Sequence, residues 1–113
     1  KQGYVALQLK NYAEAVKAFT RVLSLQTNND LARLNRAIAQ FQGGQLDAAR
    51  ADYLQLQKTF TNSPVIAYGL GEIARQKNET NEAIRNYEIY LANARTNTAE
   101  ASNVVEQLKA LKR

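Results

Sequence analysis

Hydrophobic residues return every three or four positions along most of this chain, in blocks separated by short polar turns. This spacing is typical of an amphipathic helix, whose apolar residues share one face. We therefore predict an all-α protein, in which the chain opens inside a helical pattern and further helices follow from residue 12 on. Their apolar faces run from Tyr12 to Leu23, Leu31 to Phe41, Leu46 to Phe60, Ile66 to Ala74, Ala83 to Leu91 and Ala101 to Leu111.

The turns between these blocks carry residues that begin and end helices. Asn11, either Asn29 or Asp30, and Ser63 stand where a side-chain oxygen can cap the first turn of the helix that follows. Gly43 and Gly44 predict a helix C-terminus, because glycine adopts the left-handed backbone conformation at low cost. These signals place the helix boundaries close to the edges of the apolar blocks.

A small residue followed four places later by an aromatic residue occurs three times, at a constant spacing of 34 residues. The pairs are Ala15 and Phe19, Ala49 and Tyr53, and Ala83 and Tyr87. A second series of small residues with the same spacing comprises Gly3, Ala37 and Gly71. Small side chains let helix axes approach closely, so both series are interpreted as packing positions. We predict one array made of a partial repeat (1–29), two complete repeats (30–63 and 64–97) and a C-terminal capping helix (98–113).

At these residues the chain resembles the tetratricopeptide repeat family, whose unit is a helix–turn–helix of 34 residues with an Ala-x-x-x-aromatic step in its second helix. Leu70-Gly71 also matches the Leu-Gly pair of the family's first helix. The chain departs from the family at the first-helix tryptophan, replaced by Arg33, Ala67 and Ala101, and Arg36 stands where leucine is expected. The resemblance implies an α-solenoid of antiparallel helix hairpins, a right-handed superhelix whose first helices line a concave groove.

The resemblance also implies which side chains face that groove. By position they are Tyr4, Leu7, Leu31, Leu34, Ile38, Phe41, Val65, Tyr68, Glu72, Arg75, Ser102 and Glu106.

Two interpretations of Leu31, Leu34, Ile38 and Phe41 remain open. If the two arginines of the same helix face water, the four residues are ordinary core. If the 34-residue register is kept, they form an apolar strip able to receive an amphipathic helix or an extended peptide.

Tyr68, Glu72 and Arg75 share one face of the next repeat's first helix, because they stand at i, i+4 and i+7. One interpretation is a solvated face with a local Glu–Arg pair. The other is a polar clamp for the carboxylate or backbone of a bound peptide.

Composition excludes several classes of function. Without cysteine there is no disulfide framework and no thiolate metal site, and without histidine the commonest general base is missing. The net charge is +5, to which Lys109, Lys112 and Arg113 contribute three positive charges, so the basicity is concentrated at one end. No glycine-rich phosphate loop is present, since Gly43-Gly44 lacks a following lysine. We predict a protein that is not an enzyme and that uses no cofactor or metal.

The function predicted from the sequence is a non-catalytic scaffold that presents a groove to a protein or peptide, with no small-molecule substrate. The alternatives are a basic helical array that binds nucleic acid, which the scattered charges disfavour, and a structural spacer or self-association module. The sequence begins inside a helical pattern, which suggests a piece of a longer protein, and it contains no membrane-spanning run. Residues 60–64 resemble the inter-repeat linkers of bacterial envelope assembly proteins of this family, and that resemblance implies a bacterial cell envelope or periplasmic location, with the cytoplasm as the alternative.

Overall fold

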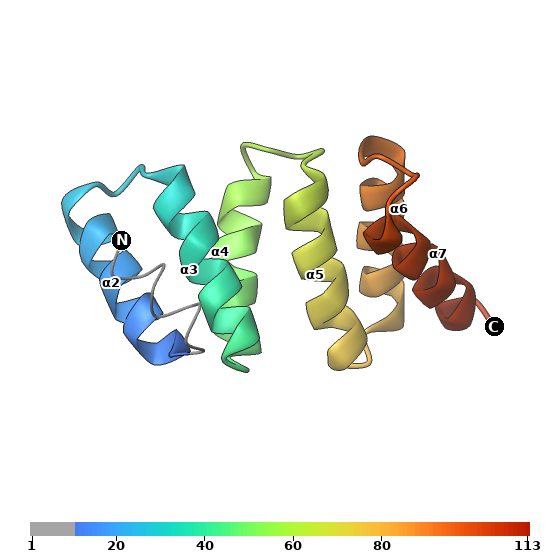
Figure 1. Cartoon of the computed structure of the whole chain (residues 1–113), viewed down its shortest axis with the longest axis horizontal. Helices are drawn as coiled ribbons and strands as arrows, with labels where there is room; N and C mark the ends of the chain where they lie inside the picture. Colours follow the sequence, from blue (N-terminus) through green and yellow to red (C-terminus); the bar gives the residue numbers. More distant parts are fainter. Residues whose placement is uncertain (1–10) are drawn as a thin grey trace. The chain divides into compact units, whose positions relative to one another are not determined.

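A computed structural model describes residues 11–113, and these form six α-helices (Figure 1). The helices are α2 (Tyr12–Leu25), α3 (Asp30–Gln42), α4 (Leu46–Gln57), α5 (Pro64–Gln76), α6 (Thr80–Asn93) and α7 (Ala99–Leu111). The predicted all-α fold class is confirmed. Among the described helices, none is both long enough and apolar enough to cross a membrane. The predictions for Gly3, Tyr4 and Leu7 lie outside the described residues.

Local capping chemistry explains where these helices begin and end. The side chains of Asn11, Asn29, Ser63 and Thr98 each accept a hydrogen bond from the amide three residues on, at 3.3, 2.9, 3.4 and 3.0 Å. Gly44 has a φ of 84°, a conformation that favours glycine, and it lies in the turn directly after the end of α3. The three N-caps predicted from the sequence and the glycine stop are therefore confirmed.

Two details of the predicted helices are wrong. Phe60 was expected on the apolar face of the helix that begins at Leu46, but α4 ends at Gln57 and Phe60 is exposed. A hydrogen bond from the Ser63 amide to the Phe60 carbonyl, 3.2 Å long, closes a turn there instead. Val22 was expected on the apolar face of α2 beside Leu23, but only Leu23 is buried. Consecutive helical residues point about 100° apart, so the core reaches only one of the two.

The described helices fall into two compact units, the N-terminal unit (residues 1–56) and the C-terminal unit (residues 57–113). In the N-terminal unit α2 packs against α3, with Ala15 and Ala39 fully buried at its core. Val16 and Phe19 of α2 pack against these two alanines. Small residues at this contact let the two helices lie close together.

In the C-terminal unit α5 packs against α6, and α7 packs against α6 (Figure 1). Its core contains Ala67, Ala74, Ala83, Tyr87, Tyr90, Ala101 and Val104. Gly71 lies directly against the ring of Tyr87, so a Cβ atom at residue 71 would come within 2.7 Å of two ring carbons. The space that the small residue leaves at the α5–α6 contact is therefore filled by an aromatic ring.

Candidate partner-binding surface

Asp52 on α4 lies between two arginines of α3 in the N-terminal unit. Arg36 donates two hydrogen bonds to this carboxylate, from Nε to Oδ2 and from Nη2 to Oδ1, both 2.8 Å long. Arg33 makes a longer contact of 3.4 Å to Oδ1 and donates to the carbonyl of Thr27 at 3.0 Å. Asp52 is 5% exposed. The hydrogen bond with Asp52 raises the pKa of Arg36 above its ordinary value, and desolvation of the guanidinium by burial opposes that rise only in part.

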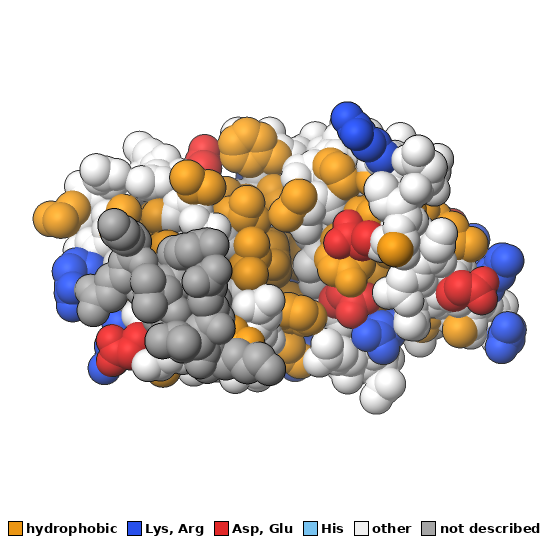
Figure 2. Space-filling model, viewed as in Figure 1, with side chains coloured by type: hydrophobic (Ala, Val, Ile, Leu, Met, Phe, Trp, Pro, Cys, Tyr) orange, Lys and Arg blue, Asp and Glu red, His pale blue; other side chains and the backbone are white. Residues whose placement is uncertain are grey.

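This ion pair fixes the rotation of α3. Helical geometry places Leu31, Leu34, Ile38 and Phe41 on the side of α3 opposite the two arginines. Leu31 is 68% exposed, and the other three are half-buried. We call these four residues the α3 strip. Figure 2 shows hydrophobic side chains over α3 on the face turned to the viewer.

The arginines therefore face Asp52 rather than water. Sequence reasoning noted Arg36 as a departure from the family's leucine but did not find its partner. The residue 34 positions after Arg36 is Leu70, and the residue 34 positions after Asp52 is Asn86. Both members of the pair thus differ from their counterparts in the next repeat, which is the signal by which their contact was recognisable.

Glu72, on α5 in the C-terminal unit, is buried and hydrogen-bonded at both carboxylate oxygens. Oε2 accepts the hydroxyl of Tyr87, and Oε1 accepts Arg75 Nη2 at 2.9 Å. Arg75 Nε also donates to the Tyr87 hydroxyl at 3.3 Å. Burial, followed by the hydrogen bond to Glu72, raises the pKa of Tyr87. The Glu–Arg pair expected from the sequence is present, but its carboxylate is already held by the protein's own groups.

Tyr68, the third residue predicted on this face, contacts a different group. Its ring lies 5.7 Å from that of Tyr90, at an angle of 51°. The hydroxyl of Tyr90 in turn donates to Glu100 Oε1 at 2.8 Å. The structure thus brings Glu72 and Arg75 together in one hydrogen-bonded cluster, while Tyr68 belongs to an aromatic pair that leads towards α7.

Beside this aromatic pair is a pocket of about 450 Å³ formed by α5, α6 and α7. We call it the α7 pocket. Its lining residues are Pro64, Val65, Tyr90, Asn93, Ala94, Arg95, Thr98 and Glu100. Sequence reasoning did not find it, because these residues come from three helices and a loop and share no periodic spacing.

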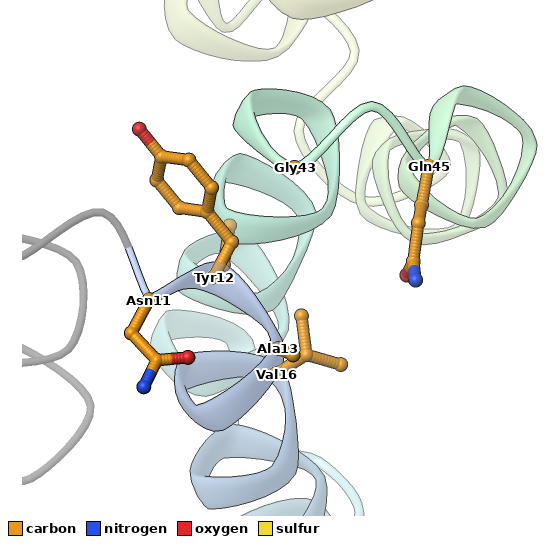
Figure 3. A pocket seen from close by; sticks show the side chains of 7 residues that line it. Asn11, Tyr12, Ala13, Val16, Gly43 and Gln45 are labelled. Atoms are coloured by element: carbon orange, nitrogen blue, oxygen red, sulfur yellow. The ribbon is translucent and has the colours of Figure 1, made fainter.

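A second pocket, of about 300 Å³, lies between α2 and the end of α3 in the N-terminal unit (Figure 3). Tyr12 and Val16 project from α2, and Gly43 and Gln45 come from the turn after α3. The remaining lining residues are Asn11, Ala13 and Ala39. The lining carries no charged side chain, and the Asn11 oxygen already caps α2. It therefore offers little for recognition of a charged partner.

Helix hairpins joined by capped turns, with small and aromatic residues that recur every 34 residues, define a helical repeat protein. A family model for the tetratricopeptide repeat matches residues 1–65 and again residues 34–98. The chain therefore belongs to the tetratricopeptide repeat family, as the sequence pattern indicated. A search of curated proteins found no match. Repeats of this family generally mediate protein–protein interaction and are generally non-catalytic scaffolds.

Proposed function

We propose that this chain binds a protein or peptide partner through the α3 strip, which would receive an amphipathic helix or an extended peptide. The observation that carries the proposal is the exposure of Leu31, 68%, in line with three half-buried large apolar residues. Exposed apolar side chains that stand in a row on one helix face favour a partner that covers them.

The gain from covering Leu31 can be approximated. Complete burial of a leucine side chain is worth about 1.5–3 kcal/mol. Covering the exposed two-thirds of Leu31 would therefore contribute about 1–2 kcal/mol to binding. One residue supplies a modest affinity, so the whole strip is needed for a specific complex.

The basic side chains lend less support to the alternative of nucleic-acid binding. Six of them in the described residues pair with carboxylates of the same chain: Arg33, Arg36, Arg75, Arg85, Lys109 and Lys112. A nucleic-acid interface needs cations that are free to contact phosphates from several repeats. Retention on heparin at low salt that disappears when residues 109–113 are deleted would assign the basicity to the C-terminal end alone.

A peptide library displayed on phage tests the proposal directly. Peptides selected on the wild-type chain would be measured against Leu31→Asp and Ile38→Asp, which place a charge in the α3 strip. Leu25→Asp is the matched control, because Leu25 is 82% exposed at the end of α2 and lies outside the strip. We expect both strip variants to lose at least about tenfold in affinity and the control to lose little.

Two results would count against the proposal. An equal loss of affinity in Leu25→Asp would show that the selected peptides do not bind specifically at the α3 strip. A collapse of the melting transition in Ile38→Asp, with Leu31→Asp binding normally, would assign Ile38 to the core. Sedimentation at high concentration addresses the self-association alternative, since a monomeric mass excludes a strip that is covered by a second copy.

A further inference from the structure

The apolar walls of the α7 pocket are already formed in the free chain. Pro64 and Val65 stand in the first turn of α5, and Val65 is 53% exposed. Tyr90 forms another wall, and its ring is held on one side by Tyr68 and at its hydroxyl by Glu100. Fixed walls lower the entropic cost of binding, because fewer side chains must be ordered by the ligand.

Two donor groups of this pocket lack a partner among the described residues. Arg95 follows α6, and its guanidinium makes no ion pair with any residue in the part of the chain that the structure describes. The first turn of α5 contains no acidic residue. Within residues 11–113, the amide of Val65 has no hydrogen-bond acceptor. The positive end of the α5 dipole therefore faces this region without a compensating charge.

The one anion of the pocket is compensated at one of its two carboxylate oxygens. Glu100 lies in the first turn of α7, where the helix dipole favours a carboxylate. Its Oε1 also accepts the hydroxyl of Tyr90. The remaining electrostatic demand of the pocket is thus for a carboxylate close to Arg95 and the start of α5.

We propose that the α7 pocket is a separate subsite for a protein partner, and that it takes a segment in which a large apolar residue adjoins Asp or Glu. The inference rests on the proposed function only in assuming a protein partner. A volume of about 450 Å³ is within the range of ligand pockets, about 300–1,000 Å³. Because the pocket is open to solvent, an internal stretch of a peptide can enter and leave it without a free chain end.

Two blocked hexapeptides test this subsite. Both are acetylated and amidated, so that neither has a terminal carboxylate, and they carry Leu-Glu or Leu-Lys at their centre. Each is titrated into the isotopically labelled chain and followed by amide NMR shifts. We expect the Leu-Glu peptide to shift Val65, Ala94 and Glu100, and to bind about tenfold tighter than the Leu-Lys peptide.

Charge reversal at Arg95 gives the decisive comparison. Arg95→Glu should lower the affinity for the Leu-Glu peptide and raise the affinity for the Leu-Lys peptide. Arg113→Glu, at an exposed position outside the pocket, should leave both affinities unchanged. Arg95 is exposed, so an unchanged melting curve is expected for its variant.

The outcomes separate this subsite from the α3 strip. The subsite is overturned if neither peptide shifts the pocket residues, or if Arg95→Glu keeps the wild-type preference. Shifts confined to Leu34 and Ile38 would also overturn it while leaving the α3 strip standing. Binding at the pocket that survives Leu31→Asp supports it as a separate site. A free-acid version of the Leu-Glu peptide that binds only through its terminus would exclude the proposed internal segment.

Discussion

The ion pair between Arg36 and Asp52 makes a quantitative prediction about stability. Asp52→Asn keeps the size of the side chain but removes its charge. The amide nitrogen of asparagine cannot accept, so one of the two 2.8 Å hydrogen bonds from Arg36 is lost. The bonds to the remaining oxygen, which include the 3.4 Å contact from Arg33, lose the carboxylate charge. Breaking a fully buried ion pair costs about 3–5 kcal/mol. The Arg33 and Arg36 side chains retain 18% and 20% of their surface, so water replaces part of what they lose. We expect the free energy of unfolding to fall by about 2 kcal/mol.

The chain itself supplies the compensating change. In the next repeat, the equivalent positions hold Leu70 and Asn86, both buried. Asn86 donates from Nδ2 to the carbonyl of Glu82 at 3.0 Å, and an asparagine at position 52 has the carbonyl of residue 48 at the same offset. Combining Asp52→Asn with Arg36→Leu should therefore recover stability to within about 1 kcal/mol of wild type.

Urea unfolding followed by circular dichroism measures both variants. Removal of the exposed pair between Lys112 and Glu88, by Lys112→Ala, is the control and should cost no more than about 0.5 kcal/mol. The reasoning is refuted if Asp52→Asn is as stable as wild type. It is also refuted if the double variant is less stable than the single one, because Arg36 would then stabilise α3 without its carboxylate.

Two further predictions concern the aromatic packing. Gly71→Ala should destabilise the chain by about 1–2 kcal/mol, because the new Cβ meets the buried Tyr87 ring at 2.7 Å and this clash outweighs the ~1 kcal/mol gained in helix propensity. Urea unfolding measures this loss, with Ser102→Ala, an exposed change in α7, as the control. Unchanged stability of Gly71→Ala would mean that the Tyr87 ring can shift. Burial raises the pKa of Tyr53 to about 12, and burial with the Glu72 hydrogen bond raises that of Tyr87, whereas an unfolded tyrosine ionises near pH ~10. The stability that the two neutral, buried tyrosines contribute is thus fully present below about pH 10 and is lost as the pH rises towards about 12. Phenolate absorbance should appear together with unfolding, and its appearance in a chain still folded would contradict the assignment.

The sequence predicts the helices well because their determinants are local. The caps Asn11, Asn29 and Ser63 act within three residues of their own position. The 34-residue series also identifies Ala15, Ala49 and Ala83 as packing positions, and all three are fully buried. Periodicity and capping chemistry therefore suffice for the architecture of the hairpins.

The contacts of the candidate surfaces are harder to predict, because they join residues far apart in sequence. Glu72 was paired with Arg75 from spacing alone, while its partner Tyr87 was considered only as a packing residue. A buried tyrosine needs a partner for its hydroxyl, so that contact had a physical signal. The position of Arg95 beside Val65 had none, since nothing in the pattern relates the end of α6 to the start of α5.

The Arg36–Asp52 pair also bears on how a chain of similar hairpins avoids folding with the wrong partner helix. Because the repeats resemble one another, α3 and α5 compete for the same second helices during folding, although Ala37 of α3 stands where Gly71 of α5 admits the Tyr87 ring. Docking of α3 against α6 in place of α4 would set Arg36 against Asn86 and leave Asp52 facing the aliphatic Leu70, so each charge would be desolvated without its counterpart. Together with the close contact between Gly71 and the Tyr87 ring, this substituted pair distinguishes the two hairpins. The substitutions Arg36→Leu and Asp52→Asn would keep a stable hairpin but remove the charge mismatch that opposes misassembly during refolding.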